Sequence, residues 1–449
     1  MADRIGMTIT DVPNDDAPAG AGAGAGVLRN VAGHVRLPAV VLALGALIAL
    51  TVFRHFRPAT DFVVTYYLVS YDAEFLRRAL LGSLLPLASE PARLVRQVDL
   101  AGIGLLALNA LFVLILAVRS LRAGTLATAV LAILLSASPL TIGYFAWDLA
   151  RPEQASYALT LGVIVAMLGR PTMPKAWLFA GAIAGVSVLG VLIHEGFVAI
   201  QLPLLLGVYA AVFGPWNAET ARRATRARVP WGTIAAVTGI VAIAVVTMLA
   251  VTVLGQRSDA FLKAFAEEAA RRYPDVARGQ IMAHGVSLTD ALHKVGDALA
   301  NPDARTLKAI LSIVVFVPVH LGLAIWAIRD TARRTGIPVG PTDLALGVLV
   351  TAAPLALCLV GIDFSRWAAY AVLNFLVFAS VLVTRRAQAR PLRMGRVPGS
   401  AAVAYAVALL VVLPSWTQVG GIDVPDPLQR FAADCLLNET PSLSACTDR

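Results

Sequence analysis

Apolar runs of helical length recur along the chain from residue 36 to residue 416. A helix needs about 20 mostly apolar residues to cross the hydrocarbon core of a bilayer. The runs that reach or approach this length predict about eleven spans, at 36–53, 98–118, 124–146, 155–169, 177–193, 197–214, 231–254, 307–328, 343–361, 365–384 and 399–416. The pair 177–193 and 197–214 also fits one broken helix with a re-entrant turn. We therefore expect an all-α, polytopic transmembrane bundle.

The segments outside these spans complete the predicted organisation. Residues 1–35, rich in Ala, Gly, Asp and Pro, are expected to form a disordered tail. Residues 36–418 form the bundle and 419–449 a polar C-terminal tail. Two long connections carry amphipathic patterns. Those in the first connection are expected to lie at the membrane interface or to dip into it, and those in the second to form external helices that cap the bundle. These patterns lie at 62–69 and 75–85 in the connection 54–97, and at 260–270 and 290–299 in the connection 255–306.

Charge sets the expected orientation of the bundle. The net charge of +9 comes with only 14% charged residues, and the excess arginines lie in short connections that alternate with acid-bearing ones. This is the positive-inside pattern of a membrane protein and not a nucleic-acid footprint, so we expect no nucleic-acid partner. It places the N-terminus in the cytoplasm, and both long connections and the C-terminal tail outside. The arginines in question include Arg29, Arg119, Arg170, Arg222, Arg329 and Arg385.

The positions of the cysteines and the absence of nucleotide-binding motifs limit the kinds of reaction that we expect. Cys358 lies inside an apolar run and is expected to be inert, whereas Cys435 and Cys446 lie in the predicted external tail. Cys435 and Cys446 could form a disulfide or remain free thiols, and the sequence leaves both alternatives open. The chain carries no Walker loop, no Rossmann glycine motif and no CxxC metal pattern, so we expect neither nucleotide-driven chemistry nor a zinc site.

Short charged motifs gather at the predicted external ends of the spans. Asp72 and Glu74 stand beside Arg77 and Arg78 in the first long connection. On a helix, Glu74 would simply pair with either arginine, three or four residues on. The functional interpretation is an acid poised for proton transfer beside guanidinium groups that grip phosphate.

The turn between the third and fourth spans carries Asp148, Arg151 and Glu153 around Pro152. Asp148 could cap the next helix and Pro152 could start it, or the acid and arginine could lie at the mouth of a cavity.

Two further motifs stand at span ends. His194 and Glu195 interrupt a long apolar run, where they form either a buried pair or a site for proton transfer or sugar binding. Asp363 and Arg366 could pair locally, with Trp367 as an interfacial aromatic. Alternatively, Arg366 would bind a pyrophosphate and Trp367 would stack on a sugar. Charged groups near lipid are costly and usually mark function.

Three of these motifs carry a family resemblance. The stretches 74–82, 193–197 and 361–367 resemble bacterial membrane proteins of envelope polysaccharide synthesis. More broadly, the chain is similar to polysaccharide polymerases of the Wzy or EpsG type, O-antigen ligases and GT-C glycosyltransferases. It departs from them in lacking a paired-acid metal motif in the first outer connection. The long outer connection also lacks an arginine-rich ligase signature, although it contains Arg257, Arg271, Arg272 and Arg278.

The resemblance implies a GT-C-like fold in the bacterial inner membrane and an external active site. The implied activity is glycosyl transfer or glycan polymerisation from a polyprenyl-phosphate-linked sugar, with no resident cofactor and a divalent cation left open. Membrane lipid and other polysaccharide assembly proteins are the further partners. A flippase or transporter of lipid-linked glycans, and a scaffold subunit of an export complex, are the alternatives. The expected catalytic residues are Asp72, Glu74, His194 and Glu195, and the expected substrate-binding residues are Arg77, Arg78, Asp148, Arg151, Asp363, Arg366 and Trp367.

Overall fold

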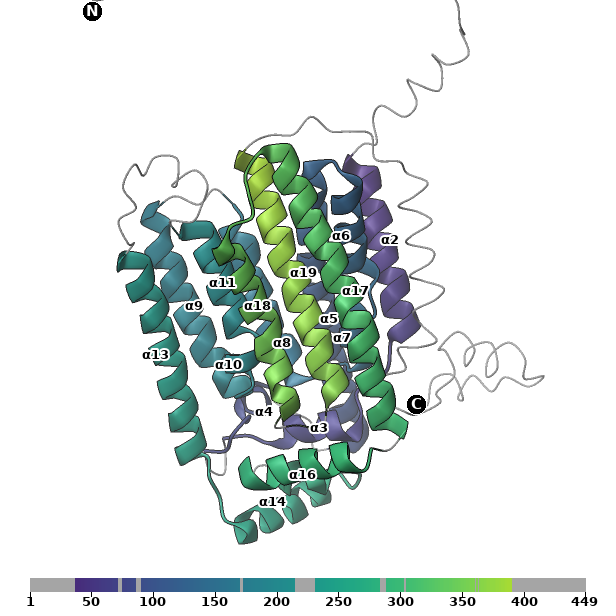
Figure 1. Cartoon of the computed structure of the whole chain (residues 1–449). Coiled ribbons are helices and arrows are strands. Elements are labelled where there is room, and N and C mark those ends of the chain that lie inside the picture. The colour runs from purple at the N-terminus through teal and green to yellow at the C-terminus, as the bar shows by residue number, and fades with distance from the viewer. Residues whose placement is uncertain are drawn as a thin grey trace, which may run out of the picture.

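The structure is a computed structural model in which the described residues are 37–71, 75–85, 90–169, 173–214, 231–282, 288–302, 304–359, 361 and 363–389. Within these ranges every regular element is helical. Long helices run side by side in one bundle, and short helices lie across one end of it (Figure 1). Several predicted features fall outside the described residues, namely the two tails, the span 399–416, Asp72, Glu74, Cys435 and Cys446.

Among the residues that the structure describes, eight helical segments are long and apolar enough to cross a membrane. The bundle consists of α2 (Leu37–His55), α5 (Pro91–Ser120), α6 (Leu126–Ala137) with α7 (Ile142–Trp147), α8 (Pro152–Met167), α9 (Met173–Ile193), α10 (Phe197–Ile200) with α11 (Leu202–Phe213), α13 (Trp231–Leu254), α17 (Ala304–Thr335), α18 (Pro341–Ala356) and α19 (Phe364–Ala389). α8 and the α10–α11 pair are shorter than these eight segments.

The predicted spans from 36–53 to 365–384 each overlap a bundle helix or helix pair. The segments 177–193 and 197–214 are separate arms: α9 runs toward the end that carries α3, and α10 and α11 return beside it (Figure 1). Gly190 permits this hairpin, because a Cβ there would lie 2.2 Å from the ring of Phe197. The span total of eleven stays a prediction.

Burial separates the centre of the bundle from its lipid-facing rim. The apolar window of α19 is entirely buried and that of α6–α7 nearly so, whereas α2, α13 and α18 bury about a fifth of theirs. Their exposed side chains are large and aliphatic, among them Leu42, Val246 and Val348. A soluble monomer rarely exposes so much contiguous apolar surface, and lipid is the solvent that accounts for it.

The short helices at the end of the bundle are α3 (Asp61–Leu68), α4 (Leu80–Leu84), α14 (Asp259–Arg272), α15 (Arg278–Met282) and α16 (Leu288–Ala300). The short helix expected at 62–69 is present as α3, and most of its residues are buried within the protein. Its position at the membrane interface, or dipping into it, stays a prediction. The segment that leads into α15 covers α3: Tyr273 donates to Asp61, and the Ala277 amide donates to Thr65 Oγ1 over 2.9 Å.

The connections with the charged motifs all reach this same end of the bundle. The turns at 148–151, 194–196 and 361–363 lie on the side of α3, α14 and α16, and the arginine-bearing helix ends of α5, α17 and α19 lie at the other (Figure 1). The alternation expected from the sequence is therefore present in the fold. Which end faces the cytoplasm stays a prediction.

Candidate functional site

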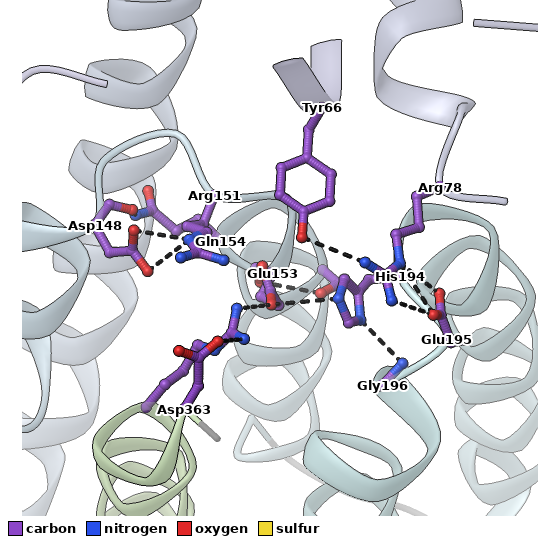
Figure 2. A network of polar contacts seen from close by, with 12 residues as sticks. Tyr66, Arg78, Asp148, Arg151, Glu153, Gln154, His194, Glu195, Gly196 and Asp363 are labelled. Carbon is purple, nitrogen blue, oxygen red and sulfur yellow. Dashed lines mark hydrogen bonds and ion pairs between the residues drawn. The ribbon is translucent and has the colours of Figure 1, made fainter. Parts of the chain in front are cut away.

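A network of ion pairs and hydrogen bonds joins four distant parts of the chain at the α3 end of the bundle (Figure 2). The loop before α4 contributes Arg78, the turn before α8 contributes Asp148 and Arg151, and the break after α9 contributes His194 and Glu195. The start of α19 adds Asp363 and Arg366, and the first turn of α8 adds Glu153.

Glu153 is the central member of the network. Its side chain is 1% exposed, and its Oε1 atom lies 3.2 Å from Arg366 Nη1 and 3.6 Å from His194 Nε2. Its second oxygen, Oε2, is buried and has no hydrogen-bond partner. Pro152 at the start of α8 presets the helical backbone here, and an acid in the first turn is favoured by the helix dipole. The structure thus holds a buried carboxylate with one oxygen free to accept a proton.

His194 is the neighbour of Glu153 on the side of the α9–α10 break. The Gly196 amide donates to His194 Nδ1 over 3.0 Å, which assigns the ring proton to Nε2, the nitrogen that faces Glu153. Burial lowers the pKa of His194 to about 4, so the ring is neutral at pH 7. Because Nδ1 already accepts and Nε2 carries the proton, neither nitrogen is left to accept a sugar hydroxyl in this arrangement. His194 lies where its Nε2–H faces the Glu153 carboxylate.

Arg78 and Glu195 form a closed, bidentate pair. Arg78 Nε lies 3.0 and 2.9 Å from the two carboxylate oxygens, Nη2 donates to Oε1, and Nη1 donates to the Tyr66 hydroxyl over 3.3 Å. Burial opposes ionisation of Glu195, but Arg78 outweighs it and holds the pKa of Glu195 well below its usual range. Arg78 engages both oxygens of Glu195, so this carboxylate acts as the partner of Arg78.

Asp148 and Arg151 pair within their turn. Pro152 starts α8 as expected, but Asp148 does not cap the helix, because Arg151 is its N-cap residue. Arg151 Nε donates to Asp148 over 2.7 Å, and the Tyr144 hydroxyl donates to the same carboxylate over 3.2 Å. The guanidinium carbon lies 4.8 Å from the ring centre of Phe62, and Nη1 is buried without a partner. One donor of Arg151 is therefore available to a ligand.

Arg366 bridges two acids. It pairs with Asp363, three residues earlier, as well as with Glu153. Its Nε is buried and has no partner. Trp367 is buried and lies 4.4 Å from the Arg366 guanidinium, against Tyr370. Neither expectation for Trp367, an interfacial aromatic or a sugar platform, matches this packing.

Buried amides and hydroxyls hold α8, α10 and α19 together beneath the network. The Tyr157 hydroxyl donates to Asn374 Oδ1 over 2.8 Å, and Asn374 donates to the carbonyl of Ile200. Gln201 Nε2 donates to Ser156 Oγ over 2.8 Å. These bonds cross three helices, so they fix Glu153 and Arg366 relative to the 194–196 break.

Backbone strain marks two positions beside the network. Among the described non-glycine residues, only Arg78 and Ala150 have positive φ, at 62° and 63°. Tertiary contacts hold Ala150 in place: Tyr67 donates to its carbonyl over 2.7 Å, and α5 approaches it closely at Gly102. Strained backbone of this kind clusters at binding and catalytic sites, and here it aims Arg78 and Arg151 at their acids.

The remaining predicted residues lie elsewhere or outside the described ranges. Arg77 packs its stem against the end of α13, where a Cβ on Gly255 would lie 2.7 Å from Arg77 Cγ. Asp72 and Glu74 are outside the described residues.

Sequence reasoning placed Glu153 in the 148–153 motif without giving it a role, although the structure makes it the centre. An acid directly after a helix-starting proline was the available signal. The sequence did not indicate Tyr66, because a tyrosine in an apolar segment is typical of a buried core residue.

Within the described ranges, no three or more His, Cys, Asp or Glu side chains are grouped so that they could hold a metal ion. Comparisons of the chain with protein-family models, with curated proteins and with solved structures find no match. The function therefore has to be argued from the geometry of the network itself.

Proposed function

We propose that this protein is a membrane-embedded glycosyltransferase, of the polysaccharide-polymerase type, that works at the outer face of the bacterial inner membrane. Its donor would be a sugar or oligosaccharide linked to polyprenyl (pyro)phosphate, and its acceptor a sugar hydroxyl. The observation that carries the proposal is the buried Glu153 carboxylate, which has one unpartnered oxygen and is oriented by His194 and Arg366.

The chemistry asks for a base and for cations beside the leaving group. Glu153 Oε2 would take the proton of the acceptor hydroxyl, whose oxygen attacks the anomeric carbon of the donor. The bond from that carbon to the phosphate oxygen breaks, and the phosphate leaves with the electron pair. Arg151 Nη1 and Arg366 Nε are unpartnered donors that suit a phosphate oxygen.

The exposure of Asp363 indicates which ion pair a substrate would meet first. Asp363 is 41% exposed, whereas Glu153 is almost fully buried. A phosphate arriving from the end of the bundle would therefore meet the Asp363–Arg366 pair first. By displacing Asp363, it would gain Arg366 without disturbing Glu153.

A transporter of lipid-linked glycans is the second candidate, and one observation favours it. The α9–α10 connection is a helix break with buried ionisable side chains, the kind of element that transporters use for substrate and ion binding. The fold does not separate the two functions, because both need a polar site at this level of the bundle.

An assay with the purified full-length protein in vesicles and a synthetic polyprenyl-pyrophosphate sugar distinguishes a transferase from a transporter. A transferase joins the sugar to the acceptor, which mass spectrometry detects as a heavier glycan and released lipid phosphate. Glu153→Gln should lower this rate at least about 100-fold, and the exposed Glu268→Gln should not change it. Movement of the unaltered donor between leaflets without product would identify a transporter. Normal product formation by Glu153→Gln would refute the catalytic role.

A further inference from the structure

The end of the bundle opposite the network carries a second feature, an open groove of about 390 Å³. It lies where α17 ends and the chain turns toward α18, and it is lined by Arg329, Ala332, Arg333, Gly336, Pro338 and Val339. Gly336 adopts a φ of 63°, which turns the chain back beside the helix. From α19, Arg386 donates to the Pro338 carbonyl over 3.4 Å and to Asp343 over 2.7 Å. The groove is thus a fixed part of the fold.

Two cations in this groove have no acidic partner within the described part of the chain. Arg329 and Arg333 are exposed and stand one turn apart on the same face of α17. Their neighbour Arg334 differs, since it pairs with Asp330 at 3.2 Å. Guanidinium groups match phosphate oxygens in geometry and charge, so the groove suits a phosphate-bearing ligand.

The same face of α17 continues from these arginines as an apolar stripe. Val315, Val319 and Trp326 are 44%, 52% and 41% exposed, and with Arg329 and Arg333 they recur at intervals of three, four or seven residues. Trp326 is the residue type that marks the membrane interface. At about 1.5 Å per residue, Arg329 and Arg333 lie roughly 5 and 10 Å beyond it. Along α17, the aliphatic side chains come first, then the aromatic side chain and then the two arginines. The acyl chains, the glycerol and the phosphate of a phospholipid follow one another in the same order.

We propose that this groove binds the phosphate headgroup of an anionic phospholipid of the surrounding membrane, with the acyl chains along the exposed stripe of α17. A soluble phosphate ester would contact Arg329 and Arg333 but would leave Val315, Val319 and Trp326 unused. The stripe therefore favours the lipid. The site is independent of the glycosyl-transfer proposal, because it lies at the other end of the bundle and shares no residue with the network.

The test uses the full chain, purified in detergent, and native mass spectrometry. Added dioleoyl phosphatidylglycerol should bind more tightly than dioleoyl phosphatidylcholine. Joint substitution of Arg329→Gln and Arg333→Gln should weaken phosphatidylglycerol binding about 10- to 30-fold, since a basic residue near anionic headgroups contributes about 1 kcal/mol. The matched control Arg334→Gln, next in sequence but paired with Asp330, should stay within about twofold of the unmodified protein.

Two results would overturn the proposal. One is equal phosphatidylglycerol affinity in the double variant and in the Arg334→Gln control. The other is binding of soluble glycerol phosphate as tight as that of the intact lipid, which would make the groove a site for free phosphate esters. If the double variant loses its monodisperse form, Arg329→Lys with Arg333→Lys replaces it. That variant keeps the positive charges but lacks the planar guanidinium donors. It should therefore bind phosphatidylglycerol several-fold more weakly than the unmodified protein.

Discussion

Burial decides what each ion pair in this protein contributes. Arg78 and Glu195 are 21% and 24% exposed, whereas Arg271 and Glu268, in α14, are 73% and 57% exposed. Both are arginine–glutamate pairs, so their chemistry is the same. Removing one partner of a mostly buried pair leaves an uncompensated charge away from water, while an exposed pair is replaced by solvent.

Glu195→Gln should therefore lower the free energy of unfolding by about 1–3 kcal/mol, because Arg78 loses its carboxylate and partial exposure screens only part of the loss. Glu268→Gln should change it by less than about 1 kcal/mol. Thermal unfolding of both variants in the same detergent measures the difference. Equal shifts would show that the Arg78–Glu195 pair is no more than a surface contact.

His194 makes a separate prediction for acid stability. Burial lowers its pKa to about 4 in the folded protein, against an ordinary value of 6.5. Between these values the unfolded chain binds more protons than the folded one. The contribution of His194 is thus complete above pH 6.5 and declines as the pH falls toward 4, by about 3 kcal/mol in total.

The apparent melting temperature should consequently fall between pH 6.5 and pH 5, and His194→Gln should flatten the fall. Glu195 does not enter in this window, because its folded pKa lies well below its usual range and its unfolded form titrates at lower pH. A profile of the same slope in the variant would assign the acid sensitivity to other groups.

At the scale of single elements, helix α5 packs against the 148–151 turn and so helps to fix the position of Arg151. Gly102 lies where this helix meets the 148–151 turn, and a Cβ there would lie 2.6 Å from Ala150 Cβ. Two residues further on, Gly104 has nothing within 4 Å of the same position. The two glycines differ only in what faces them, and they form a matched pair on one helix.

Gly102→Ala should cost about 1–3 kcal/mol of stability and displace Arg151 from its acid, because the turn must shift to admit a methyl group. Gly104→Ala should be neutral or stabilising by up to about 1 kcal/mol, since alanine favours the helix. Thermal unfolding and transferase activity of the two variants check this. Wild-type behaviour of Gly102→Ala would mean that the turn yields easily.

Element by element, sequence predicts the spans well because run length and hydropathy are local properties. The amphipathic pattern at 62–69 predicts the helix α3 but not its burial, because the cover around Tyr273 comes some 200 residues later. The sequence also does not distinguish Arg78, which has left-handed backbone and pairs with Glu195, from its neighbour Arg77. Glu153 became central through contacts with α9 and α19 that no local pattern records.

For the whole molecule, the two ends of the bundle differ in charge, and this difference predicts orientation. The ends of α17 and α19 carry Arg329, Arg333 and Arg386, whereas the arginines of the network at the opposite end are paired with carboxylates. Arginine-rich connections stay in the cytoplasm during insertion. The α14 end is therefore expected outside the cell.

A single cysteine at Ala260, in α14, should react with a membrane-impermeant maleimide in intact cells, and one at Arg334 should react only after permeabilisation. Both positions are exposed, so accessibility depends on sidedness alone. The native cysteines are replaced by serine beforehand. Labelling of the Arg334 position in intact cells would reverse the orientation and place the network in the cytoplasm.

The short helices beneath the network have a consequence for the depth of the site. α8 has 16 residues and so spans about 24 Å, less than the roughly 30 Å thickness of a bilayer core. The α10–α11 pair is similarly short, and both begin beside Glu153 and His194. Most residues of both helices are buried, so neighbouring helices and not lipid surround them. The charged groups at their ends can therefore lie at a level where direct contact with lipid would be costly.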